Sequence, residues 1–148
     1  MHLDFALNLP KEAETVALVR AAITNTLTLF GVSEECVEDI RLAVSEACNN
    51  VVSHAERDDE YEIDVHVDEL ECAIDVRNTG HGFDAATLDG VMPDPLSPRG
   101  RGVAIMKTLM DSVNMTSSPE AGTLVHLTRT LTLRDDGPIG RLRSQSGP

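Results

Sequence analysis

The sequence is poor in aromatic residues: Phe, Tyr and Trp make up only 3% of its 148 residues, and tryptophan is absent. A hydrophobic core must therefore be built mainly from Leu, Val, Ile and Ala. The hydrophobic fraction of 41% and the charged fraction of 25% are those of a soluble globular protein. At this length we expect one domain with one core.

Membrane signals are missing as well. The first residues, 1–5, contain no Lys or Arg, so they lack the basic segment with which a secretory signal peptide begins. No stretch approaches the roughly 18 apolar residues that a membrane-spanning helix needs. We therefore expect a cytoplasmic protein with no membrane partner.

The cysteines are odd in number and have no CxxC spacing. Each lies within an apolar pattern, which favours buried thiols over disulfides or metal ligands. We expect Cys36, Cys48 and Cys72 to be reduced and to hold no metal.

Positive charge is scarce. The net charge is −13, and residues 12–75 contain 17 acidic residues against 3 arginines, whereas the rest of the chain contains 8 acidic and 9 basic residues. Nucleic-acid binding depends mainly on Lys and Arg that neutralise phosphates, so nucleic acid is excluded as a partner. The acidic half could attract a basic protein, or it could be an ordinary solvated surface.

Hydrophobic periodicity predicts the secondary structure. Apolar residues at spacings of three and four predict helices over residues 12–30, 33–55 and from 103 onward. Gly31 is expected to cap the end of the first helix, and Ser33 the start of the second. Strict alternation predicts strands over residues 2–9, 61–67, 72–76, 113–117 and 123–132.

These elements predict an α/β (α+β) two-layer sandwich, in which a mixed, mainly antiparallel sheet carries three helices on one face. We expect residues 1–133 to form this domain. Residues 134–148 have no periodicity and are expected to form a disordered tail.

The second helix carries the first candidate site residues. Glu46 and Asn50 are four residues apart, so their side chains leave the same face, whereas Asn49 is rotated away from them. The surrounding run is nearly apolar, and a mostly buried helix seldom carries a glutamate without a function. A carboxylate can act as a general base, and hard oxygen ligands suit magnesium.

Two Gly-x-Gly segments supply backbone that a ligand could approach closely. They are Gly80-x-Gly82 and Gly100-x-Gly102, and the second opens a helix, whose free N–H groups favour an anion. Each segment alone is a weak signal. Basic residues gather at the second one in an otherwise acidic chain, which indicates phosphate; they are Arg99, Arg101 and Lys107.

Together these segments resemble the anti-sigma-factor serine kinases of bacteria, the RsbW and SpoIIAB-like family, within the GHKL (Bergerat) group of ATP-binding domains. The resemblance covers residues 2–133 and rests on four motifs in order: Glu46-Ala-Cys-Asn-Asn50, Asn78-Thr-Gly80-His-Gly82-Phe, Arg99-Gly100-Arg-Gly102-Val-Ala-Ile-Met-Lys-Thr-Leu-Met-Asp111 and Gly122-Thr123-Leu-Val-His-Leu-Thr-Arg129.

The family resemblance implies a role for each site residue. Glu46 would be the base that activates an acceptor serine, and Asn50 the ligand of Mg²⁺. The remaining positions would bind ATP: Asn78, Gly80, Gly82 and Thr123 at the adenine end, and Arg99, Gly100, Arg101 and Gly102 at the phosphates.

The resemblance also implies partners. The protein would be a homodimer that binds a sigma factor and phosphorylates a STAS-domain antagonist of that binding. Arg20, on the first helix, matches a family position that contacts both partners.

The chain departs from the family at Asn78, where relatives usually carry Asp. A neutral hydrogen bond to adenine is worth about 1 kcal/mol less than a charged one, or roughly fivefold in affinity. The alternative function is therefore a non-catalytic binding module that kept the fold but lost or weakened ATP binding. A histidine-kinase ATPase domain is a third possibility, disfavoured because the chain has neither an upstream phosphoacceptor helix nor a long lid.

Three histidines also invite a catalytic role. His54 follows the second helix and His126 lies in a predicted strand, so packing or surface roles are favoured for both. His81 lies between the first pair of glycines and is expected to be a variable loop position.

Overall fold

Five strands and three helices make up the described part of the chain. The structure is a computed structural model, and it describes residues 1–52, 60–78, 98–118 and 122–138. The elements in chain order are β1 (His2–Pro10), α1 (Ala13–Phe30), α2 (Glu34–Val52), β2 (Glu60–Asp68), β3 (Glu71–Asn78), α4 (Pro98–Leu109), β4 (Ser112–Ser118) and β5 (Gly122–Thr130).

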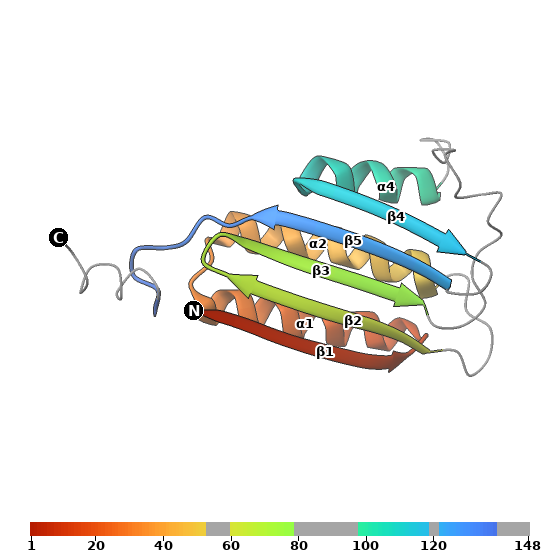
Figure 1. The fold of residues 1–148 in the computed structure, drawn as a ribbon, viewed down its shortest axis with the longest axis horizontal. Helices are drawn as coiled ribbons and strands as arrows, with labels where there is room; N and C mark the ends of the chain where they lie inside the picture. The colour runs from red at the N-terminus through yellow and green to blue at the C-terminus, as the bar shows by residue number, and fades with distance from the viewer. Residues whose placement is uncertain (53–59, 79–97, 119–121, 139–148) are drawn as a thin grey trace.

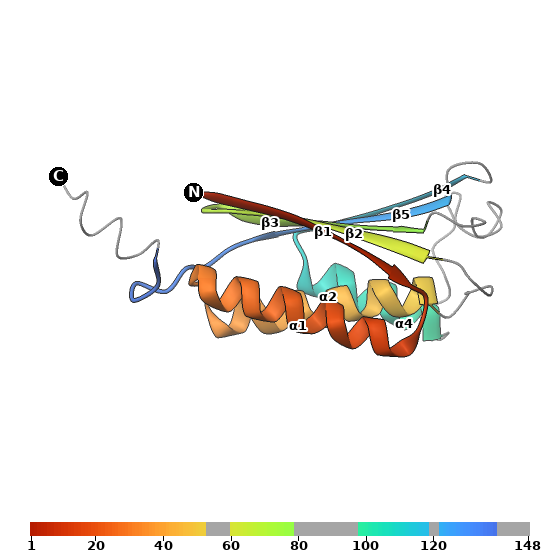
Figure 2. The same ribbon diagram turned by 90° about the horizontal axis from the view of Figure 1, so that it is seen from below.

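The strands form one sheet in the order β1-β2-β3-β5-β4. The helices cover one face of this sheet and leave the other face open (Figures 1 and 2). This confirms the predicted two-layer sandwich. All four strand pairings between the described strands are antiparallel, rather than mixed. The reason is that β5 lies between β3 and β4, which run in the same direction but never pair.

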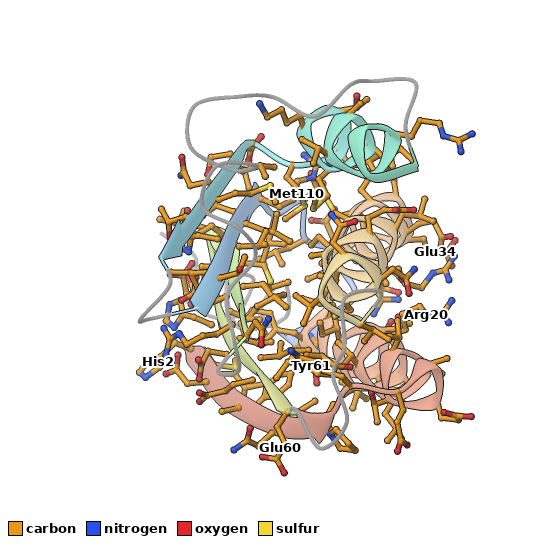
Figure 3. All side chains as sticks on the ribbon, turned by 90° about the vertical axis from the view of Figure 1, so that its right-hand side faces the viewer. His2, Arg20, Glu34, Glu60, Tyr61 and Met110 are labelled. Carbon is orange, nitrogen blue, oxygen red and sulfur yellow. The ribbon has the colours of Figure 1, made fainter. Side chains whose placement is uncertain are left out.

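The core lies between the two layers and is aliphatic, as the composition predicts. In β2 and β3 every second residue is buried, and these residues face the helices. Tyr61 is the one tyrosine of the sequence, and its side chain is fully buried between the sheet and the helices (Figure 3). Cys36, Cys48 and Cys72 are all buried free thiols, as predicted.

The turn between α1 and α2 has the predicted caps. Gly31 has a φ of 99°, a conformation that glycine adopts without strain, and its N–H bonds to the carbonyls of Leu27 and Thr28. The hydroxyl of Ser33 accepts a hydrogen bond from the N–H of Cys36 at 3.4 Å.

The chain after β5 crosses this turn. Arg134 donates its N–H to the carbonyl of Gly31 at 2.7 Å, and its guanidinium donates to the carbonyl of Thr28 at 3.1 Å. Gly137 lies so close that a Cβ added there would be 2.8 Å from the Cα of Gly31. Residues 134–138 therefore contact the domain, and the rest of the expected tail lies outside the described residues.

Helix α4 begins earlier than predicted. It starts at Pro98 instead of residue 103, so Gly100 and Gly102 belong to its first turns. Proline is favoured at the first position of a helix because its missing N–H would have no helical partner there. None of the described helices is long and apolar enough to cross a membrane.

Candidate nucleotide site

The face of α2 that carries Glu46 and Asn50 lies against α4. Both side chains are half-buried, whereas Asn49 is exposed, as the helical spacing predicts. Helix α2 packs against α1 on one side and α4 on the other. The predicted pair therefore sits at a junction of two helices.

Gly102 makes the close contact at this junction. A Cβ added to Gly102 would lie 2.8 Å from Oε2 of Glu46 and 3.7 Å from Oδ1 of Asn50. The first of these distances is too short for a carbon atom beside an oxygen without a shift of the Glu46 side chain. Glycine at position 102 thus leaves room for the Glu46 carboxylate where it lies, whereas the distance to Asn50 is that of an ordinary contact.

The first turns of α4 are suited to an anion. They contain no acidic residue, and the N-terminal N–H groups of a helix, with its dipole, favour negative charge. Gly100 and Gly102 are buried, whereas Arg101 and Lys107 are exposed. The side chain of Arg99 is not among those described.

A second polar pair lies on the sheet. Asn78, at the end of β3, is directly opposite Thr123, near the start of β5, and both side chains face the helices. They are 2% and 1% exposed, which is unusual for polar residues. The structure thus brings together two residues that are 45 positions apart in the sequence.

Tyr61 extends this pair into a row. It is directly opposite Asn78 on the other side of β3. Its hydroxyl shares a 2.8 Å hydrogen bond with the hydroxyl of Thr15, which also donates to the carbonyls of Pro10 and Glu12. Tyr61 was not predicted as a residue of the site. Its position as the lone tyrosine, at the start of a strand, could have indicated one.

Both polar groups lie at the same end of the sandwich. The C-terminal ends of α2 and β3 and the N-terminal ends of α4 and β5 meet there (Figure 1). Glu46, Asn50, Gly102, Asn78 and Thr123 therefore belong to one end of the molecule. Gly80 and Gly82 were predicted at the same site, but they lie outside the described residues.

Arg20 lies apart from these residues. It is half-buried on α1, and Figure 3 shows it on the helix layer, on the side away from the sheet. Burial raises the pKa of the Cys48 thiol to about 12, and the positive charge of Arg20 offsets part of this effect. Cys48 therefore stays protonated at neutral pH, and the charge of Arg20 is not balanced by a thiolate.

The histidines play no part in this end of the molecule, as far as the described residues show. His126 lies on the open face of the sheet, where its Nδ1 bonds to a carboxylate oxygen of Asp75. This agrees with the surface role predicted for it. His54 and His81 lie outside the described residues.

The arrangement of the site fits a nucleotide with a divalent cation. A carboxylate and an amide oxygen of α2 face the N-terminal turns of α4, which offer N–H groups to phosphates. The carboxylate of Glu46 reaches into the space that a Cβ at Gly102 would need. Buried Asn78 and Thr123 offer hydrogen-bonding groups for a base at the same end.

A family comparison decides what kind of domain this is. The model of the histidine kinase-like ATPase domain matches residues 9–129, which are most of the chain. The chain belongs to the histidine kinase-like ATPase family. Within this family it is similar to the "Serine-protein kinase RsbW" of Listeria innocua, with 32% identity over 78% of this chain and 80% of that protein.

Solved structures of low identity share the ATPase fold. The chain resembles the RsbU and RsbW domains of Rv1364c from Mycobacterium tuberculosis, with a TM-score of 0.65, 18% identity, and coverage of 87% of this chain and 32% of that one. It also resembles the SiaB-SiaC complex of Pseudomonas aeruginosa, with a TM-score of 0.58, 11% identity, and coverage of 85% of this chain and 88% of that one.

Proposed function

We propose that this member of the ATPase family is an ATP-dependent protein-serine/threonine kinase and anti-sigma factor that works by partner switching. It would bind a sigma factor and phosphorylate a STAS-domain antagonist, whose unmodified form displaces that sigma factor. The observation that carries the kinase activity is the contact between Gly102 and Glu46, because it brings a carboxylate to the helix end that suits phosphates.

Each site residue then has a task. Bound ATP would supply the phosphoryl group that is transferred. Asn50 would hold Mg²⁺ through its amide oxygen, and the first turns of α4 would bind the phosphates through N–H groups with Arg99 and Arg101 beside them. Gly80, Gly82, Asn78 and Thr123 would bind the adenine. Glu46 would accept the proton of the acceptor hydroxyl.

Arg20 is the proposed contact for the protein partners. Its Nε is buried and has no hydrogen-bond partner among the described residues, although it lies near the surface of the helix layer. A buried donor without an acceptor is costly, so a carboxylate or carbonyl of a bound partner would stabilise it. We further propose that the protein is cytoplasmic and a homodimer.

The alternative is a binding module of the same fold that no longer uses ATP, and Asn78 is the observation that favours it. Titration calorimetry with Mg-ATP separates the two functions. Binding in the micromolar range is expected for the kinase. No heat at millimolar nucleotide would reject the kinase and leave the binding module.

A second experiment tests the role of Glu46. The Glu46→Gln variant should keep ATP affinity but lose phosphotransfer from radiolabelled ATP to a purified STAS-domain protein. Glu34→Gln is the matched control, because Glu34 lies in the first turn of the same helix, away from this contact. Retained transfer in Glu46→Gln would reject Glu46 as the base.

A further inference from the structure

Arg129 is a charged residue on the inner side of the sheet. Burial alternates along β5, and Arg129 follows Val125 and Leu127 on the side that faces the helices. Its side chain is only 23% exposed, and a charged group is seldom covered to that extent unless it is paired. It lies near the C-terminal end of β5, whereas Thr123 of the proposed site lies near the N-terminal end. The proposed function gives Arg129 no task.

The guanidinium of Arg129 joins the sheet to helix α2. Its Nη2 donates a hydrogen bond to Oδ2 of Asp39 at 3.0 Å, and the Asp39 side chain is 25% exposed. Asp39 precedes Glu46 on α2 by close to two helical turns, so the two side chains leave the same side of the helix. The ion pair therefore lies on the side of α2 that carries Glu46 and faces α4.

Asp111 holds the end of α4 at the same place. Its N–H donates to the carbonyl of Thr128 at 2.8 Å, and its carboxylate accepts from the N–H of Thr130. The pairing of β4 with β5 sets Ser112 opposite Thr128, so Asp111, the residue before, comes beside Arg129. Hydrogen bonds with Thr130, and then the charge of Arg129, lower the pKa of the Asp111 carboxyl. Arg129 thus acts on one carboxylate of α2 and on a second directly after α4.

The contact between α2 and α4 has this cluster at one end and the proposed site at the other. Gly102 meets Glu46 at the site end. Met106 lies one turn after Gly102 on the same side of α4 and is fully buried. Apolar packing of this kind has no direction of its own, so it does not fix how far one helix slides along the other. A hydrogen-bonded ion pair does.

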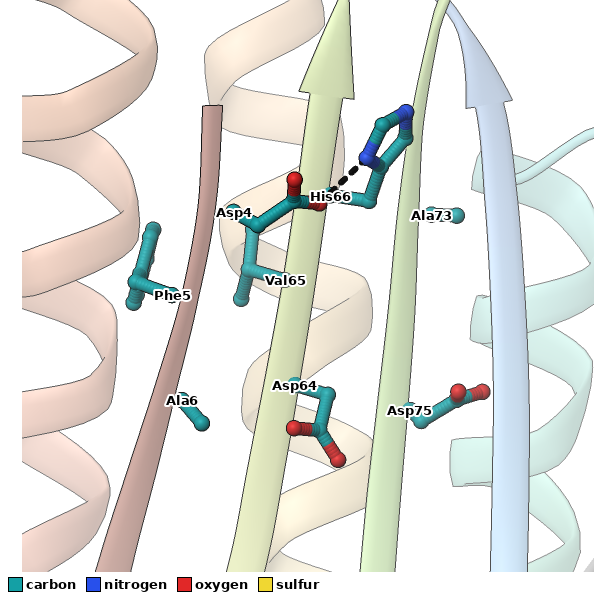
Figure 4. A pocket seen from close by; sticks show the side chains of 8 residues that line it. All are labelled: Asp4, Phe5, Ala6, Asp64, Val65, His66, Ala73 and Asp75. Carbon is teal, nitrogen blue, oxygen red and sulfur yellow. Dashed lines mark hydrogen bonds and ion pairs between the residues drawn. The ribbon is translucent and has the colours of Figure 1, made fainter. Parts of the chain in front are cut away.

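The ion pairs on the open face of the sheet differ from this one. Asp4 bonds to His66 there (Figure 4), and Asp75 bonds to His126. Both pairs join residues that are directly opposite each other on neighbouring strands, where the backbone ladder already fixes the distance. The pair of Arg129 with Asp39 joins a strand to a helix, and no ladder exists between those two elements.

We propose that Arg129 is a positioning residue for phosphotransfer: it holds Asp39 of α2 and the end of α4 at Asp111 together, and so sets where Gly102 meets Glu46. This inference rests on the proposed kinase function and adds to it a residue at the opposite end of the sandwich. Arg129 touches neither ATP nor the acceptor hydroxyl. It acts through the two helices that carry the phosphate end of the site.

Two variants remove the ion pair, one from each side. Arg129→Met and Asp39→Asn should each lower the kcat of phosphotransfer about tenfold, because a misplacement of about 1 Å can cost up to a hundredfold. The KM for ATP should stay nearly unchanged, because the base end of the site is held by strand pairing. Arg134→Met is the matched control: it removes an arginine whose guanidinium bonds to Thr28 of α1 instead, and should leave kcat unchanged.

A double-mutant cycle with Gly102→Ala separates positioning from a general loss of stability. If Arg129 acts through the contact of Gly102 with Glu46, the second substitution has less left to disturb, so the combined loss of kcat is smaller than the product of the single losses. A loss equal to that product would overturn the proposal, and so would a wild-type kcat in both single variants. Asp39→Asn keeps the shape of the side chain, so it carries the cycle if Arg129→Met does not fold.

An NMR measurement without nucleotide keeps this inference apart from the proposed function. Asp39→Asn should shift the backbone amide resonance of Gly102 and the side-chain amide resonances of Asn50, although both lie at the other end of the α2–α4 contact. Arg134→Met should leave them in place. Unshifted resonances in Asp39→Asn would reject the role of Arg129 even in an active kinase. A wild type without phosphotransfer would reject the proposed function, and the same shifts would still decide whether Arg129 sets the contact.

Discussion

The proposed phosphate end of the site is carried by two helices, whereas the proposed base end is carried by two strands. At the phosphate end, Glu46 and Asn50 are half-buried and face a glycine of α4. At the base end, Asn78 and Thr123 are almost completely buried and held opposite each other by a strand pairing. Side-chain packing between α2 and α4 sets the distance between Glu46 and Gly102. A backbone ladder fixes the distance between the strand-borne residues.

This difference predicts that the phosphate end controls the rate and the base end controls affinity. Gly102→Ala should have the largest effect. The added Cβ would displace the carboxylate of Glu46, and a misplacement of about 1 Å can lower the rate of phosphotransfer roughly a hundredfold. The free energy of unfolding should not fall, because alanine favours a helix over glycine by up to about 1 kcal/mol. Kinase assays and urea denaturation measure the two quantities.

The control for Gly102→Ala is Ala104→Gly in the same helix. Ala104 is exposed, so this variant should lower the free energy of unfolding by roughly 1 kcal/mol and leave the rate unchanged. A Gly102→Ala protein with the wild-type rate would show that the contact with Glu46 does not matter for catalysis.

At the base end, Asn78→Asp should change affinity. A carboxylate accepts a stronger hydrogen bond from the adenine amino group, so ATP should bind about fivefold more tightly by calorimetry. Without nucleotide the same variant should be less stable than wild type, because it buries a charge at a position that is 2% exposed. Asn114→Asp, the same replacement on the exposed strand β4, should change neither quantity, and equal effects in both variants would contradict the prediction.

The stability of the base end should depend on the row formed by Tyr61, Asn78 and Thr123. Tyr61→Phe removes its 2.8 Å hydrogen bond to Thr15 and should lower the free energy of unfolding by about 1 kcal/mol. Thr15→Val and the double variant complete a double-mutant cycle, measured by urea denaturation. A coupling energy near zero would show that this bond contributes nothing to the end of the sheet.

The open face of the sheet belongs to neither end of the site. A substitution on this face should give the smallest effect. His66 bonds to Asp4 and, at 3.2 Å, to Asp68, and hydrogen bonds to these carboxylates raise its pKa. Protonated His66 therefore stabilises the folded state. This contribution is fully present below the pKa of an unfolded histidine and is lost as the pH rises through the raised pKa of His66 in the folded state. Asp4→Asn should therefore lower the pKa of His66 in an NMR titration, without effect on ATP binding. An unshifted titration would reject the contact.

Much of this arrangement could be predicted because it depends on residues close in sequence. The spacing of Glu46 and Asn50 places them on one helix face, and the alternation from Tyr61 to Val67 marks a strand whose odd-numbered residues are buried. Capping by Gly31 and Ser33 follows from the local preferences of these residues. Each of these features was confirmed.

What the sequence could not show are contacts between distant segments. The insertion of β5 between β3 and β4 decides that Asn78 meets Thr123, and no local pattern encodes that order. The contact of Gly102 with Glu46 likewise depends on how α2 and α4 pack. The predicted start of α4 was wrong by several residues. The two glycines indicated a loop there, and the preference of proline for the first turn of a helix was given too little weight at Pro98.

The path of residues 131–138 across the α1–α2 turn has a consequence for how the domain can be joined to others. The turn and the N-terminus both lie at the end of the sandwich opposite the proposed nucleotide site (Figure 1). The hydrogen bonds of Arg134 to Gly31 and Thr28 hold the outgoing chain at that end. A reporter or another domain attached before His2 or after Pro138 therefore starts at the end of the sandwich opposite the proposed ATP site. The fold thus keeps its points of attachment apart from its chemistry.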